Sequence, residues 1–205
     1  EDLNGDGYGT AWRKADAPDR QGITENLHVQ GHLAFWDELR RRNPSLRIDS
    51  CASGGRRNDL ETMRRSVPLL RSDWSCMPFK DAPLQCEGNQ SHTYGLSSWL
   101  PWQGAGVHFT HSYSVRSYYL TGFGMIIPGG WRKTAEDIAA VQKGYSECRR
   151  IAPLMLGDYF PLTPHSLDTT SWMAWQFYRE DLGEGVVQAF RRPDSSSATL
   201  SVKLR

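Results

Sequence analysis

The sequence predicts an α/β fold over residues 1–164, followed over residues 165–205 by the first strands of an antiparallel β domain. In the first part, short apolar runs alternate with longer stretches of helical periodicity. Strands that alternate with helices form right-handed βαβ units, which give a parallel sheet. In the second part, strand-length runs are joined by Gly- and Ser-rich turns, which favour antiparallel strands.

The first helical pattern runs from Asn26 to Asn43. Its apolar residues are spaced as on one face of a helix, which predicts a single buried stripe. These residues are Leu27, Val29, Leu33, Phe35, Trp36 and Leu39. The pattern ends before Pro44, because proline cannot continue a helix. The three arginines at 40–42 are expected to form a solvated helix end, which the helix dipole favours.

His28 and His32 on this helix have the i, i+4 spacing of a helical zinc pair. The residues between them include no Glu, which zinc-protease chemistry needs. We therefore expect both imidazoles on a solvated helix face.

Two strand-length runs follow, "LRIDSC" at residues 46–51 and "VPLLRSDW" at residues 67–74. Between them, "ASGGRR" turns the chain into the short helical pattern "NDLETMRRS", for which Asn58 is the expected N-cap. The second run closes on Asp73.

A polar segment with two cysteines, Cys76 and Cys86, is interpreted as an insertion after the second run. The two thiols could be bridged in an oxidising compartment, or both could stay reduced. The apolar segments "GAGVHFTHS" and "LTGFGMIIP" come next, and a helix is expected over "KTAEDIAAVQKGYSECRRIAPLML". Thr134 and Asp137 give this helix a capping-box start. Three short strands are expected after Pro164, with "DLGEG" as their first connection.

Composition excludes several classes of function. The 205 residues carry 24 Lys and Arg against 23 Asp and Glu, a formal charge of +1, which argues against an electrostatic nucleic-acid binder. No apolar run reaches the roughly 20 residues of a membrane span. The chain opens without Met or a signal peptide, so it is expected to be a piece of a longer chain, and neither compartment nor oligomeric state is assigned.

The opening stretch "EDLNGDGYGTAW" has two interpretations. Asp2, Asn4, Asp6 and Gly7 are spaced like the start of a calcium loop. Such a loop needs a bidentate acid at its twelfth position, which is Arg13 here, so calcium binding is disfavoured. In the alternative, Asp2 is a catalytic carboxylate at the end of a strand, and Asp6-Gly7 belongs to the loop after it.

Reactive side chains gather at three expected strand ends: Asp2 with Asn4, Cys51 before a Gly54-Gly55 turn, and Asp73. In a parallel α/β barrel, active sites are assembled from such ends. Two converging carboxylates are what hydrolysis of a glycosidic bond requires, and in retaining enzymes they lie about 5–5.5 Å apart. Glycines permit close approach of the backbone.

Aromatic and imidazole side chains offer weaker candidates. Trp99, Trp102 and Trp131 could stack on a sugar face or pack in the core. His108 and His111 lie near an expected strand end, where they could line a pocket or belong to an ordinary loop.

The block "DSCASGGRRNDLETMRRSVPLLRSD" resembles the barrel segment of glycoside hydrolase family thirty-six, the α-galactosidase or melibiase family. That family has a Cys-[Ser/Ala]-Ser-Gly-Gly turn, and a Ser-Asp whose Asp is the general acid/base and follows the Cys by twenty-two residues, as Asp73 follows Cys51. The family nucleophile ends a Lys-Trp-Asp-x-Asn pattern, which "EDLN" matches in its last three positions. The resemblance also covers "DAPDRQGITEN", "SHTYGLSSWLPWQGAGVHFTHS" and "QFYREDLGEGVVQAF".

By this resemblance, Asp2 is the nucleophile and Asp73 the acid/base, while Asn4, Cys51 and Gly54 contact the sugar. The implied fold is the C-terminal half of a (β/α)8 TIM barrel at 1–164, then the start of the C-terminal β domain. The implied reaction is retaining double displacement on a terminal α-linked galactose of an oligosaccharide or glycoside, with no metal or organic cofactor.

The chain departs from the family pattern at two places. Glu1 stands where the family has Trp, and Trp74-Ser75-Cys76 stands where most members have Asn-Thr-Asp. Other α-linked sugars, transglycosylation, or a catalytically silent carbohydrate-binding remnant therefore stay open as alternatives. Because a barrel without its first strands has open edges, the chain alone is expected to be inactive.

Overall fold

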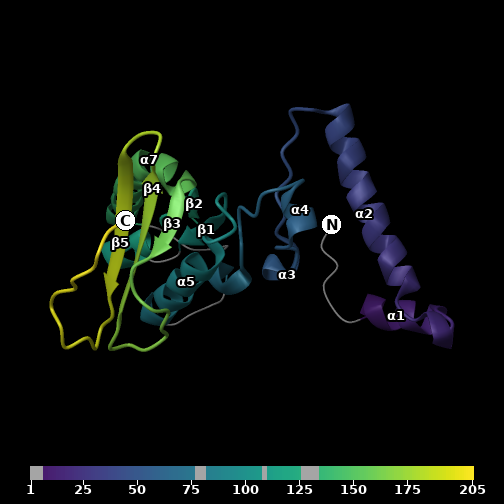
Figure 1. The fold of residues 1–205 in the computed structure, drawn as a ribbon, viewed down its shortest axis with the longest axis horizontal. Helices are drawn as coiled ribbons and strands as arrows, with labels where there is room; N and C mark the ends of the chain where they lie inside the picture. Colours follow the sequence, from purple (N-terminus) through teal and green to yellow (C-terminus); the bar gives the residue numbers. More distant parts are fainter. Residues whose placement is uncertain (1–6, 77–81, 108–109, 126–133) are drawn as a thin grey trace. The chain divides into compact units, whose positions relative to one another are not determined.

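The computed structural model describes residues 7–76, 82–107, 110–125 and 134–205 (Figure 1). The chain divides into two compact units, Glu1–Ser72 and Asp73–Arg205. Each unit is described by itself.

The first unit is mainly helical. The helix predicted from Asn26 is confirmed and begins slightly earlier, because α2 runs over Ile23–Arg42 and its C-cap Asn43 donates its N–H to Leu39 O. The other elements are α1 (Gly7–Ala15), the 3₁₀ turn η1 (Pro18–Arg20), α3 (Ala52–Gly55) and α4 (Leu60–Met63).

Helices α1 and α2 are joined by a row of four rings. The Trp12 ring lies 4.8 Å from His28, whose ring lies 6.5 Å from His32, and His32 lies 4.6 Å from Trp36. The histidines expected on a solvated face therefore pack between two indoles, and Trp36 is buried. Apart from Trp36, the prediction that one apolar stripe of α2 is buried is wrong in this structure, because Leu27, Val29 and Phe35 are exposed.

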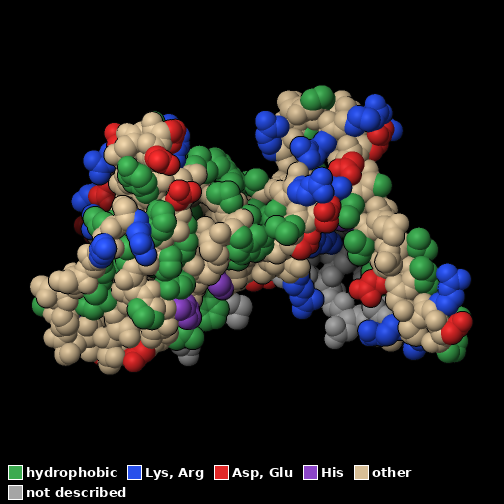
Figure 2. All heavy atoms as spheres, viewed as in Figure 1, with side chains coloured by type: hydrophobic (Ala, Val, Ile, Leu, Met, Phe, Trp, Pro, Cys, Tyr) green, Lys and Arg blue, Asp and Glu red, His purple; other side chains and the backbone are tan. Residues whose placement is uncertain are grey.

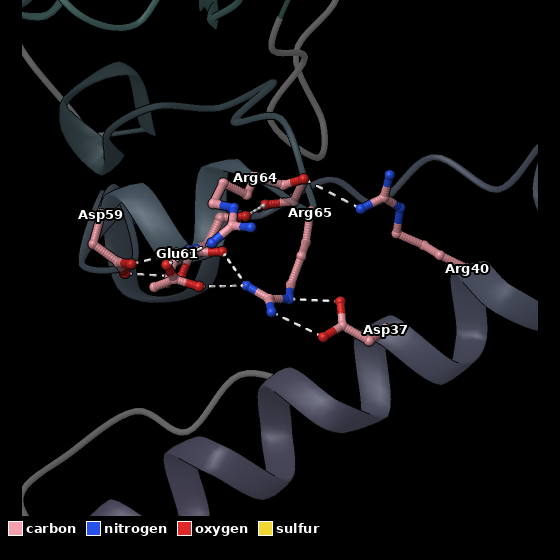
Figure 3. A network of polar contacts seen from close by, with 8 residues as sticks. Asp37, Arg40, Asp59, Glu61, Arg64 and Arg65 are labelled. Atoms are coloured by element: carbon pink, nitrogen blue, oxygen red, sulfur yellow. Dashed lines mark hydrogen bonds and ion pairs between the residues drawn. The ribbon is translucent and has the colours of Figure 1, made fainter.

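An ion-pair network joins α2 to α4 and the residues that follow it (Figure 3). Arg65 donates to both carboxylate oxygens of Asp37 on α2, at 2.7 and 2.8 Å, and to Glu61 Oε2 on α4 at 2.8 Å. Arg40 donates to the backbone oxygen of Arg64 at 3.2 Å. Arg40, one of the three arginines expected to form a solvated helix end, therefore also makes a specific contact.

The two runs predicted as strands in this unit pair at a single point. Asp49 and Val67 form a parallel bridge, in which Ser50 N donates to Val67 O at 3.0 Å and Val67 N donates to Ile48 O at 2.9 Å. The Asp49 carboxylate extends the contact by accepting from Leu69 N at 3.0 Å. The parallel direction agrees with the prediction, although the pairing is too short to form strands.

The second unit holds two small sheets. Strands β1 (Gly104–Val107) and β2 (Gly122–Met125) pair in parallel, with Gly104 opposite Gly122. Strands β3 (Asp158–Pro161), β4 (Trp172–Arg179) and β5 (Glu184–Arg191) form an antiparallel sheet in that order. The "DLGEG" segment spans the end of the β4–β5 connection and the start of β5, as expected for the first connection. The third strand expected after β5 is wrong, because residues 192–205 form no strand; the third strand of the sheet is β3, which begins before Pro164.

Helices cover these sheets and surround an aromatic core. The elements are η2 (Asp73–Cys76), α5 (Ala82–Leu96), α6 (Ser112–Ser117), α7 (Ala135–Ile151) and η3 (Ala152–Leu156). The predicted capping box of α7 is confirmed, because Thr134 and Asp137 exchange both bonds. In contrast, α5 occupies much of the segment interpreted as an insertion. Trp175, Met173, Tyr118 and Val107 are fully buried in the core.

The surface carries both signs of charge. Figure 2 shows Lys, Arg, Asp and Glu side chains interspersed over the helices of the first unit on this face. Interspersed charges create no extended field of one sign, which agrees with the near-neutral composition. Within the described parts of the chain, none of the helices combines the length and apolar character that crossing a membrane requires.

Candidate functional site

The turn after the first predicted strand carries two of the predicted sugar contacts. Cys51 is the N-terminal flank of α3, a single turn that ends in two glycines with positive φ, Gly54 at 68° and Gly55 at 90°. Gly55 N donates to Cys51 O at 3.2 Å, which closes the turn. Cys51 and Gly54 therefore lie on one tight turn, as predicted, and both are half-buried.

This turn packs closely against the end of the second predicted strand. A Cβ on Gly55 would lie 2.2 Å from Arg71 O, so no larger residue fits without moving the backbone. Asn58 reinforces the contact, because its Nδ2 donates to the same oxygen at 3.0 Å. Because Gly55 has no side chain, the turn can lie directly against the backbone of Arg71, two residues before Asp73.

The predicted N-cap of the helix that follows is wrong. Asp59 caps α4, since its carboxylate accepts from Thr62 N at 2.9 Å and from Thr62 Oγ1 at 2.8 Å. Asn58 instead holds Arg71 O. Both residue types suit an N-cap position, so only the tertiary contact decides between them.

Buried polar groups surround the turn. Ser50 and Arg71 are each 2% exposed. Within the described residues, Ser50 Oγ and Asn58 Oδ1 are buried and have no hydrogen-bond partner. Buried polar atoms are normally satisfied, and atoms left unused beside a turn can bind the hydroxyl groups of a ligand. Sequence reasoning did not single out Ser50 or Arg71, because their burial depends on the packing of the two runs.

Asp73 lies in the second unit, at the first position of η2. Its side chain is exposed. The backbone next to Asp73 is anchored by the following residue, because Trp74 Nε1 donates to Gln85 O on α5 at 3.1 Å. Gly88 makes room for the indole, since a Cβ there would lie 2.2 Å from Trp74 Nε1. Trp74, a departure from the resembled pattern, therefore fixes the backbone next to the predicted acid/base.

Asp2 and Asn4, the predicted nucleophile and sugar contact, lie outside the described residues. Gly7, expected in a loop, is instead the first residue of α1, which includes Arg13. A helix over Gly7–Ala15 occupies the positions that would form the second half of a calcium loop, which is a further argument against that site.

The weaker candidates have different roles. His111 caps α6 by accepting from Ser114 N through Nδ1 at 3.3 Å. Trp99 and Trp102 are 40% and 42% exposed, so neither is a core residue of the described structure. His108 and Trp131 lie outside the described residues. No cluster of three potential metal ligands occurs in the described parts of the chain.

The cysteines differ in environment. Cys86 and Cys148 are buried in the second unit, and Cys86 is not in a disulfide. Burial raises the pKa of the Cys86 thiol and raises that of Cys148 to about 11. A high pKa leaves little thiolate, so these two cysteines are poor nucleophiles, whereas half-buried Cys51 is accessible.

Comparison with known structures supports an α/β fold. No family model and no curated protein sequence matches the chain. Its structure is similar to the GH36 α-galactosidase AgaB from Geobacillus stearothermophilus, with a TM-score of 0.71 and 22% identity over 93% of this chain and 27% of that one. A substituted AgaA from the same organism, in complex with raffinose, gives a TM-score of 0.70 at 22% identity over the same shares.

The galactosidase domain of AgaSK, an α-galactosidase–sucrose kinase, gives a TM-score of 0.65 at 22% identity over 84% of this chain and 24% of that one. These matches confirm the resemblance to GH36 α-galactosidases at the level of the fold. The chain spans only 24% to 27% of the lengths of these solved proteins.

Proposed function

We propose that the chain is the part of a retaining α-galactosidase-like glycoside hydrolase that carries both catalytic carboxylates. The observation that carries the proposal is the Cys51–Asp73 segment. Its turn and its strand end pack together through Gly55, Asn58 and Arg71. The fold of the chain as a whole is similar to that of an α-galactosidase, which supports the proposal. In the proposed architecture, this segment belongs to the C-terminal half of a (β/α)8 barrel, and β3–β5 begin a C-terminal β domain.

The proposed reaction proceeds in two displacements. A carboxylate oxygen of Asp2 attacks the anomeric carbon, the glycosidic C–O bond breaks, and the departing oxygen takes the proton of Asp73. Asp73 then removes a proton from water, whose oxygen attacks the anomeric carbon and releases Asp2. Two inversions restore the original configuration, and no metal or cofactor takes part.

The remaining predicted residues bind the sugar. Cys51 and Gly54 present a half-buried thiol and a bare backbone on one turn, and Asn4 supplies an amide for a sugar hydroxyl. Ser50 Oγ and Asn58 Oδ1 lie beside this turn as further polar groups. Because AgaA is solved with raffinose, an oligosaccharide that ends in α-linked galactose is the proposed substrate class.

The test compares the full translated product of the gene with its Asp73→Asn variant. Each protein is assayed with raffinose and with an aryl α-galactoside whose leaving group needs no protonation. If Asp73 is the acid/base, the Asp73→Asn change should lower kcat/KM for raffinose by about a hundredfold or more. It should lower kcat/KM for the activated glycoside much less, because kcat/KM reports the first displacement and that leaving group needs no proton. Equal losses on both substrates would contradict that role.

Two controls accompany this assay. The anomeric proton of the first product, followed by nuclear magnetic resonance, should show retained configuration. The 205-residue chain expressed alone should show no turnover, because in the proposal the pocket needs a closed barrel. Sugar binding by the full product without any turnover would favour a silent carbohydrate-binding protein instead.

A further inference from the structure

A groove of about 720 Å³ lies between the C-terminal end of α5 and strand β3, within the second unit. Figure 1 shows these two elements next to each other. We call it the Trp99 groove and define it by six of its lining residues: Tyr94, Ser98, Trp99, Asp158, Tyr159 and Phe160. None of them is a residue of the proposed catalytic site.

The walls of the groove are held in place by hydrogen bonds. Tyr94 donates its hydroxyl to Thr163 O at 2.7 Å, and Tyr159 donates its hydroxyl to Tyr94 O at 2.9 Å. Their rings are nearly perpendicular, with centroids 6.4 Å apart. The His165 ring packs on Tyr94 at 5.4 Å. These contacts fix the aromatic walls before any ligand arrives, which lowers the entropic cost of binding.

Trp99 offers the groove a large flat apolar surface. It is 40% exposed, although the indole is among the side chains that gain most from burial. A pyranose ring has an apolar face of C–H bonds and a rim of hydroxyl groups. It can therefore cover the indole and still reach polar groups at its edge.

The polar groups of the groove suit a neutral ligand. Among the described residues that line it, Asp158 is the single charged one, and it accepts hydrogen bonds without being able to neutralise an anion. Hydroxyl groups come from Ser97 and Ser98, and Ser98 Oγ also donates to Gly95 O at 2.9 Å. A site with an aromatic wall and a few polar groups, one of them a carboxylate, favours sugar hydroxyls over phosphate or carboxylate ligands.

A second depression extends the groove. It has a volume of about 520 Å³ and shares Gly157 and Asp158 with the first. Its other lining residues include Tyr178, Arg179 and Glu180, so it is more polar than the Trp99 groove. Two adjoining depressions provide room for a ligand longer than a single sugar ring.

We propose that the Trp99 groove binds a neutral oligosaccharide or polysaccharide chain, as a site separate from the proposed catalytic carboxylates. Such a site holds the protein on a polymeric substrate and leaves the hydrolysis of small glycosides unchanged. It does not depend on Asp2 or Asp73, so it would survive failure of the proposed catalytic function.

The test is native electrophoresis of the full translated product in gels with and without galactomannan. Free galactose is added to occupy the catalytic pocket. The native protein should be retarded by galactomannan. Trp99→Ala should weaken binding about tenfold or more, since it removes most of an apolar sugar contact. Trp102→Ala is the matched control, because Trp102 is 42% exposed and does not line the groove.

Several results would overturn the proposal. They are an unretarded native protein, equal losses in Trp99→Ala and Trp102→Ala, or retardation that galactose abolishes. Gels that contain polygalacturonate, an anionic chain, should retard none of the variants. If Trp99→Ala proves unfolded by circular dichroism, Asp158→Asn serves in its place. The exposed Asp158 side chain can be changed without loss of the β3–β4 backbone pairing, so its variant must also bind more weakly.

Discussion

Arg65 binds both carboxylate oxygens of Asp37, which lies 28 residues earlier in the chain, through Nε at 2.7 Å and Nη2 at 2.8 Å. The same guanidinium donates to Glu61 Oε2 at 2.8 Å. Its side chain is only 14% exposed, whereas the side chain of the neighbouring Arg64 is 71% exposed and pairs with Glu61. Arg65 therefore links α2 to the segment that leads from the Cys51 turn to Asp73.

Replacing Arg65 should loosen this link. Arg65→Met keeps much of the apolar stem but removes the two-pronged bond to Asp37, so we expect the melting temperature to fall by about 2–4 °C. Arg64→Met is the matched control and should change it by less than about 1 °C, since exposed ion pairs contribute little. Thermal melts followed by circular dichroism measure both. Equal shifts in the two variants would contradict a special role for Arg65.

The contribution of Arg65 should depend on pH. The hydrogen bond from Arg65 lowers the pKa of Asp37, and Arg65 is also the largest cause of the lowered pKa of Glu61. A carboxyl with a lowered folded-state pKa adds stability above its unfolded pKa of about 4, and this stability is lost as pH falls through the folded value. In melts from neutral to acid pH, the difference between the wild type and Arg65→Met should shrink once the pH falls below the unfolded-state pKa, because protonated carboxyls no longer pair with the guanidinium. A difference that grows on acidification would show that the sign is wrong.

Gly88 should be intolerant of even a methyl group. A Cβ there would lie 2.2 Å from Trp74, and overpacking a site of this kind costs about 1–3 kcal/mol. Gly95 lies on the same helix with nothing within 4 Å of a Cβ, so Gly95→Ala should be neutral or stabilising by up to about 1 kcal/mol. Denaturant unfolding of the two variants gives the comparison. Similar stabilities would show that the Trp74 contact does not constrain α5.

Thiol reactivity should separate Cys51 from the buried cysteines. With its pKa raised to about 11, Cys148 has about one thiolate in a thousand at pH 8, so its alkylation should be slow. Iodoacetamide should therefore modify half-buried Cys51 before Cys86 or Cys148, and galactose should slow the modification of Cys51 alone. Peptide mass spectrometry follows each site. Unchanged labelling of Cys51 in saturating galactose would argue against its contact with the sugar.

Local signals in the sequence predicted some elements well. The capping box at Thr134 and Asp137 begins α7 as expected, because both bonds depend on residues three positions apart. The end of α2 at Asn43, before Pro44, follows from backbone sterics in the same way. Such signals need no knowledge of distant residues.

Helix α5 was missed because its buried face is polar. Gln90 Nε2 donates to Ser117 Oγ on α6 at 2.8 Å, and Asn89 Nδ2 donates to Ser117 O. Both side chains are buried. A search for apolar periodicity reads such residues as a surface loop, since their partners lie 27 and 28 residues away.

The candidate site likewise has some features that the sequence predicts and others that depend on distant residues. The tight Cys51–Gly55 turn could be predicted from its glycines, and positive φ at Gly54 and Gly55 agrees with that. The role of Asn58 could not be predicted, because Arg71 O, its partner, lies 13 residues away. The exposure of Trp99 also could not be predicted, because it depends on tertiary packing and a tryptophan is equally compatible with a core position.

The most direct test of the proposed function is to trap the covalent intermediate. The full translated product is treated with a fluorinated α-galactosyl fluoride that forms the glycosyl–enzyme and releases it slowly. The peptides are then mapped by mass spectrometry. We expect one galactosyl adduct per protein on the peptide that carries Asp2, and no adduct in the Asp2→Asn variant. An adduct on a different carboxylate, or turnover with inverted configuration and no adduct, would contradict it.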